Sequence, residues 1–529
     1  MRFFLLTVFA TSFKTQNEVA QLTLCVPLRQ PLRPFAFKKN MDITQNLLKQ
    51  TLGSKRKAES IARRIQKVVP AYQHFLQTHK LKIPAAFENL PTLDKKSYIL
   101  AYPFAKLLGD DADKTLAIFR SSGSSGNAFF WTYLKSSSRF TALGTRIFLE
   151  QSFAVHKKKT LAIVGLGLGS WLPGEHVSWG LKNMALQVHY PFLVFTPGNN
   201  LEEIIEMIHK MKDFVEQIIL LIVPSAIAYL HLKANQLQKP LPLAKLRYIA
   251  LSEPFPESIR TSLAKRAEIS ENLPFMFSMY GSTDTGGLGA ESLATIALRK
   301  LLVQNLLLAQ ELNISLPIPL FFHFFAANTF LETVNGNLCI TKWQGIPLLR
   351  YLVYDKVAFY SWRKLKKAIL NSDYLNPENE PFVKIIASAS NWLPNLLAVT
   401  GRSDRCLILG GTNLTEYMLD EAVKCEELQN ILTGIYRARI VYEEERQYLA
   451  FDLELCQGVI ENEEIIQKVY HSLIQSLGKV EPFFLSDWQN IYRHWDSDPT
   501  KQILRLNFLP FPTLSQTIET SIKQRGIVK

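Results

Sequence analysis

A run of serine and glycine is the first feature of the chain that could do chemistry. Ser121 to Gly126 contains four serines and two glycines. The apolar segments Leu116–Phe119 and Phe129–Trp131 flank it, so we expect a tight loop between two strands. Small residues allow successive backbone N–H groups to face one anion, and the hydroxyls add further donors. Such a loop could bind a triphosphate. A flexible surface loop is an equally good interpretation of the same residues.

A second segment starts at Tyr280, directly after apolar residues 275–279 that we interpret as a strand. In open α/β sheets, ligands bind at the carboxyl ends of strands. The Tyr280 ring can stack on a purine, and the hydroxyls of Ser282 and Thr283 can bind phosphate. The carboxylate of Asp284 can hold a hard cation such as Mg²⁺. A glycine-rich structural turn is the alternative interpretation.

The third segment, residues 400–413, contains Arg402, Asp404 and a Gly410–Gly411 turn. An arginine here could bind ribose or phosphate oxygens through its forked N–H groups. The composition changes at this point of the chain, so Asp404 could serve as a hinge between domains. An ordinary surface ion pair is the alternative.

Size and cysteine content limit the class of protein. The 529 residues, 47% of them hydrophobic, can form two or more domains with large cores. The sequence has no charge-free apolar run of about eighteen residues, so we expect no membrane-spanning helix. Its five cysteines are scattered without a CxxC spacing, which favours a reduced, cytoplasmic location.

The net charge of +14 is compatible with nucleic acid, an acidic membrane surface or small anionic ligands. The densest basic run, Lys55–Lys67, has helical spacing and is most simply a solvated helix face. The sequence has no basic stripe with interleaved aromatic residues, so we expect no nucleic-acid partner. Gly165, Gly167 and Gly169 follow an apolar run, but the last glycine of a dinucleotide-binding motif is missing.

The spacing of apolar residues predicts an α/β fold. Between residues 115 and 400, short runs rich in β-branched residues alternate with helical patterns, which is typical of βαβ units and a mainly parallel sheet. We expect strands at Leu161–Val164, Ile218–Val223 and Tyr248–Leu251. A helix should follow Asn200, because Asn200 and Glu203 fit a helix N-terminus.

After Arg402 the pattern changes to a compact α+β one. Tyr436–Tyr442 and Gln447–Leu455 are interpreted as two strands, and the apolar spacing from Ile465 to Leu477 predicts a helix. We therefore expect a leader segment at residues 1–40, a large N-terminal domain at 41–403 and a smaller C-terminal domain at 404–529.

Six short segments, taken in order, make the chain resemble the adenylate-forming superfamily, and within it the phenylacetate-coenzyme A ligase-like branch. The resemblance extends from about Pro70 to the end of the chain. Each segment alone is a weak match, and their shared order carries the resemblance. The segments are Ser121–Ala128, Pro197–Asn200, Ser252–Pro254, Tyr280–Asp284, Pro347–Asp355 and Gly401–Asn413.

The resemblance implies a large N-terminal domain with mainly parallel sheets flanked by helices and a small α+β lid. It implies that ATP and a carboxylic acid form an acyl-adenylate and pyrophosphate, after which the acyl group passes to coenzyme A. ATP, Mg²⁺ and coenzyme A would be the cofactors, and a small-molecule acid the partner. A homodimer is an option for the oligomeric state.

The resemblance also implies roles for individual residues. Lys523, Asp284 and Arg402 would be catalytic, with Asp284 also binding Mg²⁺ and Lys501 as the fallback for Lys523. Asp404 would be the hinge of the lid. The nucleotide would be bound by Ser121, Ser122, Gly123, Ser124, Ser125, Gly126, Ser252, Glu253, Pro254, Tyr280, Gly281, Ser282, Thr283, Asp355 and Arg402.

Four positions depart from the pattern of this branch. Asn127 replaces a lysine, Asp284 a glutamate, Tyr354 a glycine and Arg405 an aspartate. The departure at Asn127 favours one alternative, a noncatalytic nucleotide-binding homologue. Transfer of the acyl group to an amine or a carrier protein is a second alternative to coenzyme A. His176 could line a pocket for the acid, with packing in the core as the alternative.

Overall fold

The computed structural model describes residues 55–121, 129–270, 273–324, 329–391, 393–403, 406–443, 445–515 and 527, with only the backbone for 138–140. All of these residues belong to one compact unit, Leu47–Lys529.

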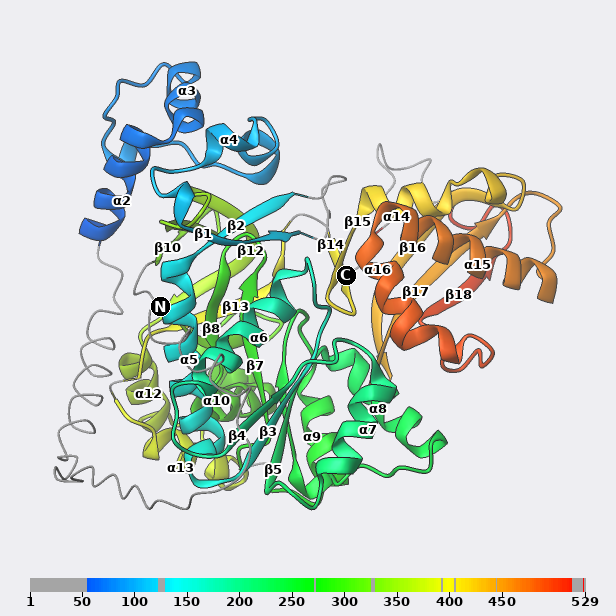
Figure 1. Ribbon diagram of the computed structural model, residues 1–529. Coiled ribbons are helices and arrows are strands. Elements are labelled where there is room, and N and C mark those ends of the chain that lie inside the picture. The colour runs from blue at the N-terminus through cyan, green and yellow to red at the C-terminus, as the bar shows by residue number, and fades with distance from the viewer. Residues whose placement is uncertain are drawn as a thin grey trace, which may run out of the picture. The chain divides into compact units, whose positions relative to one another are not determined.

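An eleven-stranded sheet is the centre of the fold (Figure 1). The strand order is β10-β11-β12-β13-β9-β8-β7-β6-β5-β3-β4. Neighbouring strands are parallel from β4 to β7 and antiparallel from β7 to β10. The strands are β3 (Thr160–Gly165), β4 (Phe192–Phe195), β5 (Gln217–Ile222), β6 (Leu246–Ala250), β7 (Met276–Ser282), β8 (Gly286–Ala290), β9 (Leu320–Phe324), β10 (Thr329–Val334), β11 (Asn337–Lys342), β12 (Leu348–Tyr360) and β13 (Leu396–Arg402).

Helices cover the parallel half of the sheet. Every residue of β3 and β5 is buried, as expected for parallel strands with helices on both faces. Asn200 Oδ1 accepts a hydrogen bond of 3.1 Å from the Glu203 N–H and thereby caps helix α7. The helices of this half are α5 (Lys135–Phe153), α6 (Leu172–Ala185), α7 (Leu201–Met211), α8 (Pro224–Gln236) and α9 (Glu257–Arg266).

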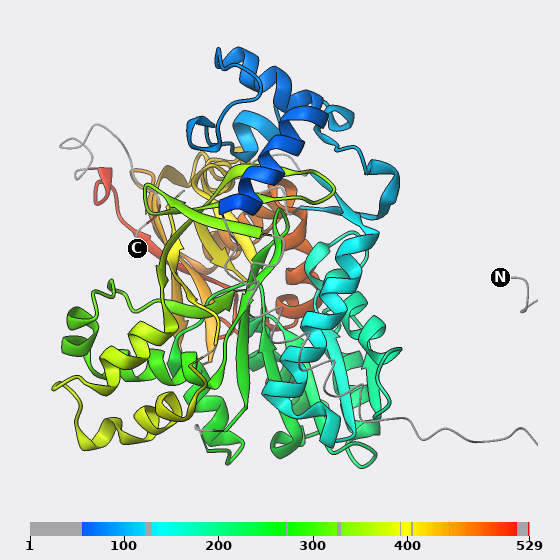
Figure 2. The ribbon, with the colours of Figure 1, turned by 90° about the vertical axis from the view of Figure 1, so that its left-hand side faces the viewer.

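Two further groups of helices pack against the antiparallel half (Figure 2). Helices α2 (Lys55–Val68) and α3 (Pro70–Thr78) share an apolar cluster with β11 and β12. A second cluster surrounds the fully buried Trp362 and joins β9 and β13 to four helices. These helices are α10 (Leu293–Gln304), α11 (Leu306–Glu311), α12 (Trp362–Leu370) and α13 (Glu380–Ser388).

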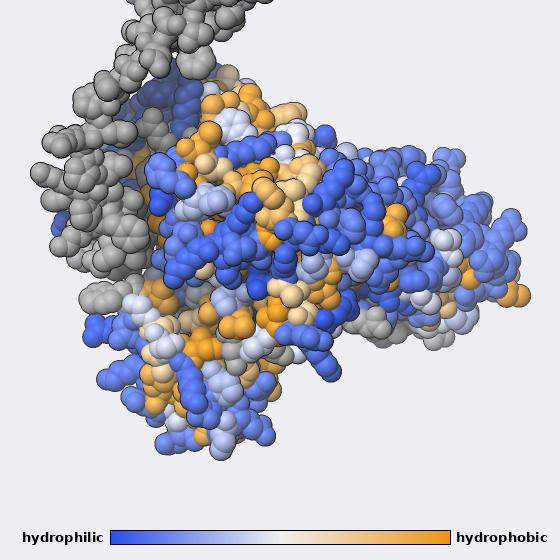
Figure 3. Space-filling model, turned by 60° about the horizontal axis from the view of Figure 1, so that its bottom comes forward, coloured by the Kyte–Doolittle hydropathy of each residue, from blue (hydrophilic) through white to orange (hydrophobic). Residues whose placement is uncertain are grey.

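The C-terminal part has a smaller sheet of its own. Strands β16 (Leu432–Glu443) and β17 (Arg446–Leu455) are antiparallel, and β18 (Leu504–Leu509) pairs with β17 in parallel. On the face that Figure 3 shows, hydrophilic residues cover most of this part. The other elements of this part are the hairpin β14 (Cys406–Leu409) and β15 (Thr412–Thr415) and the helices α14 (Glu416–Val423), α15 (Glu463–Val480) and α16 (Pro482–Asp487).

The expected α/β fold class, with a large sheet and a smaller C-terminal sheet, is confirmed. The three expected parallel strands correspond to β3, β5 and β6, and the expected C-terminal pair to β16 and β17. In the central sheet, parallel pairing is confined to the half between β4 and β7, and every neighbouring pair from β7 to β10 is antiparallel. The domain boundary at residues 403 and 404 stays a prediction, since one apolar cluster includes both Leu407 and the parallel strands.

The described residues include no helix with the length and apolar content needed to cross a bilayer.

Candidate active site

Tyr280 and Arg402, which are distant from each other in the chain, both contact the carboxylate of Asp355. Asp355 on β12 and Arg402 at the end of β13 are opposite each other in the antiparallel pairing. The Tyr280 hydroxyl donates to Asp355 Oδ2, and Arg402 Nη1 donates to Oδ1 over 3.1 Å. Burial, followed by the negative charge of Asp355, raises the pKa of Tyr280 well above its usual range, so Tyr280 remains a hydrogen-bond donor.

The Tyr280 ring is held by an aromatic partner that the sequence analysis missed. Phe322 on β9 stacks on it, with ring centroids 5.4 Å apart and an interplanar angle of 26°. The stacking fixes the plane of the Tyr280 ring.

Asp284 lies on the turn between β7 and β8, close to the first cluster. Its Oδ2 accepts a hydrogen bond of 2.5 Å from the Tyr351 hydroxyl, and its backbone carbonyl accepts one of 2.7 Å from Gln344 Nε2. Lys342 Nζ donates to the carbonyl of Thr285, the next residue. Three side chains from the β11–β12 region therefore fix the position of this turn.

The metal-binding capacity of this turn is limited to one carboxylate. No group of three or more His, Cys, Asp or Glu side chains arranged to hold a metal occurs among the described residues. Mg²⁺ is commonly bound by one or two carboxylates together with substrate phosphates and water. The donor set around Asp284 therefore fits Mg²⁺ that arrives with a nucleotide, rather than an ion held by protein ligands alone.

Two buried polar side chains, Lys342 and His176, have strongly perturbed pKa values. Burial lowers the pKa of Lys342 to about 8. Burial, with a contribution from the charge of Lys342, lowers the pKa of His176 to about 4, so the imidazole is neutral at pH 7. His176 Nε2 lies 3.2 Å from Thr141 Oγ1, which in turn lies 2.8 Å from the Tyr133 hydroxyl. Lys342 was not among the expected site residues, because a single lysine at the end of a strand is not part of any recognisable sequence motif.

Ser252, Glu253 and Pro254 follow β6, which is adjacent to β7, so they lie at the same edge of the sheet as Tyr280. Ser252 has a positive φ of 74°, and the buried Glu253 accepts a hydrogen bond of 2.6 Å from the Ser225 N–H. Burial raises the pKa of Glu253 to about 7, although backbone hydrogen bonds, including those of Gly410 and Gly411, oppose this shift.

The C-terminal part packs directly on this segment. A Cβ atom added to Gly411 would lie 2.8 Å from Ser252 Cβ, and the Tyr442 hydroxyl donates to the Pro254 carbonyl over 3.0 Å. Asn199 Nδ2 also donates to Asp487 Oδ1 across 2.9 Å. The β14–β15 hairpin and the region after α15 therefore cover the carboxyl ends of β4 and β6.

Ser121 is the one residue of the predicted phosphate loop that the structure describes. The β1 (Thr115–Arg120) and β2 (Phe130–Leu134) strands pair around it, as expected for a loop between two strands. Its N–H donates to the Phe129 carbonyl over 2.8 Å, and its Oγ accepts from the Phe129 N–H over 3.0 Å. Lys95 Nζ donates to the same Oγ over 3.3 Å. Ser122, Gly123, Ser124, Ser125 and Gly126 lie outside the described residues.

A short segment around Asp94 connects this loop to the Asp355 cluster. The Tyr354 hydroxyl donates to Asp94 Oδ2 over 2.6 Å, and the Ser403 N–H donates to the Tyr354 carbonyl over 2.8 Å. Lys95 is the next residue after Asp94, and Tyr354 directly precedes Asp355. A continuous path of contacts thus joins Ser121 to Asp355 and Arg402.

The lysine and hinge predictions fall largely outside the described residues. Lys523 and Asp404 both lie there, so their roles stay predictions. Lys501, the fallback for Lys523, is described. Its Nζ forms an ion pair with Asp498, and its carbonyl accepts a hydrogen bond of 3.0 Å from the Tyr229 hydroxyl.

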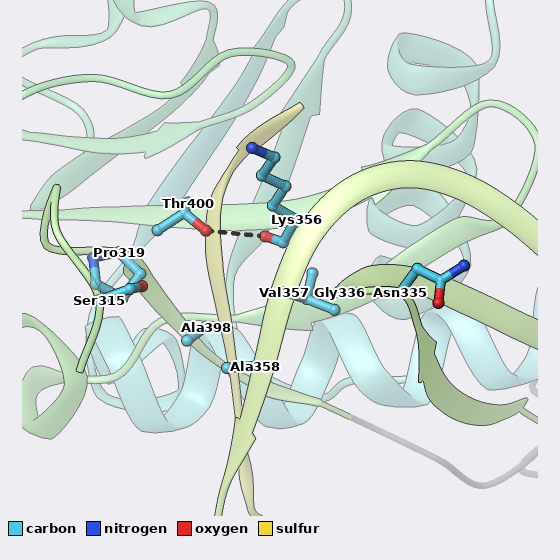
Figure 4. Close-up of a pocket in the computed structure, with 9 residues that line it drawn as sticks. All are labelled: Ser315, Pro319, Asn335, Gly336, Lys356, Val357, Ala358, Ala398 and Thr400. Atoms are coloured by element: carbon cyan, nitrogen blue, oxygen red, sulfur yellow. Dashed lines mark hydrogen bonds between the residues drawn. The ribbon is translucent and has the colours of Figure 1, made fainter. Parts of the chain in front are cut away.

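A separate pocket of about 260 Å³ lies beside the β12–β13 ladder (Figure 4). It lies between Pro319, the turn at Gly336 and the strand residues Lys356 and Thr400. The Thr400 hydroxyl donates to the Lys356 carbonyl over 3.2 Å. None of the predicted site residues lines this pocket, so it is distinct from the candidate active site.

Comparison with known proteins identifies the fold. Neither the protein-family models nor the curated protein sequences contain a match. Among solved structures, the chain is similar to a 2-hydroxyisobutyryl-CoA ligase in complex with 2-HIB-AMP and CoA in the thioesterification state. The TM-score is 0.59 and the identity 11%, over 92% of this chain and 90% of that one. The chain has the fold of adenylate-forming enzymes.

A second similar structure is the acyl acid amido synthetase AtGH3.15 in complex with 2,4-DB. Its TM-score is 0.41 at 11% identity, over 95% of each chain.

Proposed function

We propose that the protein is an AMP-forming ligase that activates a carboxylic acid with ATP and transfers the acyl group to coenzyme A. The main observation behind the proposal is that Tyr280 and Arg402 both donate to the Asp355 carboxylate at the edge of the sheet. The fold shared with a ligase that binds an acyl-adenylate supports it. The phenylacetate-coenzyme A ligase-like branch and the small-molecule acid remain part of the proposal.

Each residue of the cluster has a chemical part in nucleotide binding. The Asp355 carboxylate accepts from the ribose hydroxyls, and Arg402 keeps it oriented. Adenine stacks on the ring of Tyr280, whose plane Phe322 fixes. Ser282 and Thr283 lie on the same turn and supply hydroxyl donors for phosphate oxygens.

The first step requires a carboxylate to attack the α-phosphate of a polyanion. Fixed N–H donors and cations offset the charge that accumulates on this phosphate. Asp284 is the residue that would hold Mg²⁺, which supplies positive charge to the phosphate oxygens when bound. Lys523 would donate the remaining positive charge from the C-terminal part, with Lys501 as the fallback.

The acid would lie behind the β7–β8 turn, next to Lys342 and His176. Both side chains are polar and lie within the fold, and the Thr141–Tyr133 pair continues the polar surface. Lys342 can orient the substrate carboxylate towards the nucleotide through its N–H donors.

Acid-dependent exchange of radioactive pyrophosphate into ATP tests the proposal. An enzyme that forms an acyl-adenylate reversibly catalyses exchange with at least one member of a panel of aromatic and medium-sized acids. Tight ATP binding without exchange for any acid favours a noncatalytic homologue instead. Adding coenzyme A, an amine or a carrier protein to the active acid then identifies the acceptor from the product formed.

A further inference from the structure

Helix α2 carries a row of cations that the candidate active site does not use. Apolar residues of the helix, among them Ala58 and Ile65, are fully buried and form its inner side. Arg56, Arg63 and Lys67 follow one another at spacings of seven and four residues. Since a turn of the helix takes about 3.6 residues, these three lie on one side, opposite the buried one. We call this row of cations the α2 stripe.

The α2 stripe is exposed and has no counter-charge. All three of its side chains are exposed, and the helix, dark blue in Figure 2, lies on the outside of the molecule. Two other cations of the helix are paired, Lys55 with Glu88 and Arg64 with Asp110. Within the part of the chain that the structure describes, no carboxylate is within ion-pair distance of the stripe, and this includes Glu59, the acidic residue of α2.

An exposed apolar side chain belongs to the segment beside the α2 stripe. The Gln66 side chain donates to the Ala85 carbonyl over 3.1 Å and accepts from the Ala85 N–H over 2.7 Å. These two bonds hold the segment that ends at Ala85 against α2. The segment includes the exposed Lys82 and Ile83, the latter with 41% of its surface exposed. Cations combined with an apolar side chain are typical of protein surfaces that contact the interface of a bilayer.

The chemistry of this surface fits a lipid bilayer better than a nucleic acid. Anionic headgroups form a continuous layer, which a protruding helix can contact along its whole length. Proteins that bind single-stranded nucleic acids combine cations with aromatic side chains that stack on the bases. Helix α2 has no aromatic residue, and Tyr72 and Phe75 of the neighbouring α3 are buried.

We propose that the α2 stripe, together with Lys82 and Ile83, docks the protein peripherally on a bilayer that contains anionic lipids. The cations contact the headgroups, and Ile83 enters the interface. This inference goes beyond the proposed function and does not depend on it, because no residue of the candidate active site takes part. A lysine or arginine close to an anionic leaflet strengthens binding roughly fivefold, so the stripe should strengthen it about a hundredfold.

Co-sedimentation of the full-length protein with vesicles tests the proposal. One set of vesicles contains phosphatidylcholine alone, and the other contains phosphatidylcholine mixed with phosphatidylserine. The wild type should bind the second set about a hundredfold more tightly, and added salt should weaken this binding. The combined variant Arg56→Gln, Arg63→Gln and Lys67→Gln should lose most of the preference. Its melting temperature should equal that of the wild type, because the three side chains are exposed and unpaired among the described residues.

Two further variants separate the α2 stripe from overall charge and from guanidinium geometry. The combined variant Arg363→Gln, Lys364→Gln and Lys367→Gln is the matched control, because it removes the same charge from exposed positions of α12. It should bind the anionic vesicles like the wild type. Arg56→Lys combined with Arg63→Lys should also bind like the wild type, since a bilayer surface responds to charge rather than to the forked donors of arginine.

Several outcomes would overturn the proposal. The first is a wild type that binds both sets of vesicles equally or binds neither. The second is an equal loss of binding in the α2 and α12 variants, which would mean that net charge alone is responsible. The third is a wild type that ignores vesicles but binds a DNA probe through the α2 stripe, which would assign this surface to nucleic acid.

Discussion

Removing the carboxylate of Asp355 should selectively abolish recognition of the ribose. Asp355 is buried and already oriented by Tyr280 and Arg402, so it can accept from ribose hydroxyls without reorganising. A hydrogen bond to a charged group contributes about 1.5–3 kcal/mol, and 1.4 kcal/mol corresponds to a tenfold change in affinity. Asp355→Ala should therefore weaken ATP binding at least tenfold.

Titration with ATP and with 2′,3′-dideoxy-ATP separates ribose binding from a general structural effect. The wild type should prefer ATP by at least about tenfold, and Asp355→Ala should bind both nucleotides equally weakly. Tyr280→Phe is the matched control, because it removes a hydrogen bond to the same carboxylate and keeps the aromatic ring. This variant should retain most of the preference for ATP. A wild type that binds the two nucleotides equally would refute the reasoning.

Three further predictions follow from the site and its C-terminal cover. Lys523→Ala should abolish acid-dependent pyrophosphate exchange and leave ATP affinity within about twofold of wild type, because one lysine of the C-terminal part acts on the transition state. Loss of exchange in Lys501→Ala instead would transfer that role to Lys501. In the folded state the pKa of Glu253 is raised from its ordinary value near 4.5 to about 7. Between these two pH values the folded protein therefore binds one proton more than the unfolded chain. The contribution of Glu253 to stability is complete below about pH 4.5 and falls by about 3 kcal/mol as the pH rises to 7, and Glu253→Gln should flatten this part of a urea-unfolding profile. An equally steep profile in the variant would show that other groups cause the fall. Gly411→Ala should destabilise the protein more than Gly458→Ala, because φ is 82° and 83° at the two positions but only Gly411 has a neighbour, Ser252, in the way. Equal melting temperatures for the two variants would mean that the hairpin does not pack on Ser252 in solution.

The elements that carry the site could be predicted from sequence because their signals are local. The apolar runs of β3, β5 and β6 and the Asn200 cap depend on neighbours in the chain. The placement of Tyr280 near the carboxyl end of a strand also follows from a local signal, the apolar run before it, and β7 ends at Ser282. Local patterning was therefore sufficient to place the proposed site residues at this edge of the sheet.

The contacts within the site could not be predicted, because they depend on strand order. The Tyr354 hydroxyl reaches Asp94 across 260 positions of sequence, and Phe322 stacks on Tyr280 because β9 lies near β7 in the sheet. Hydrophobic periodicity predicts strands, but it does not determine which strands become neighbours or in which direction. The same limit explains why the antiparallel half was expected to be parallel and why Lys95 and Lys342 were missed.

Photoaffinity labelling with 8-azido-ATP, followed by peptide mapping, tests most directly whether these separate segments hold one adenine nucleotide. The account predicts labelling of the peptide that contains Tyr280 or of the one that contains Ser252–Pro254, and loss of this labelling when excess ATP is present. Labelling that ATP does not suppress, or that lies only on peptides remote from this edge of the sheet, would contradict it.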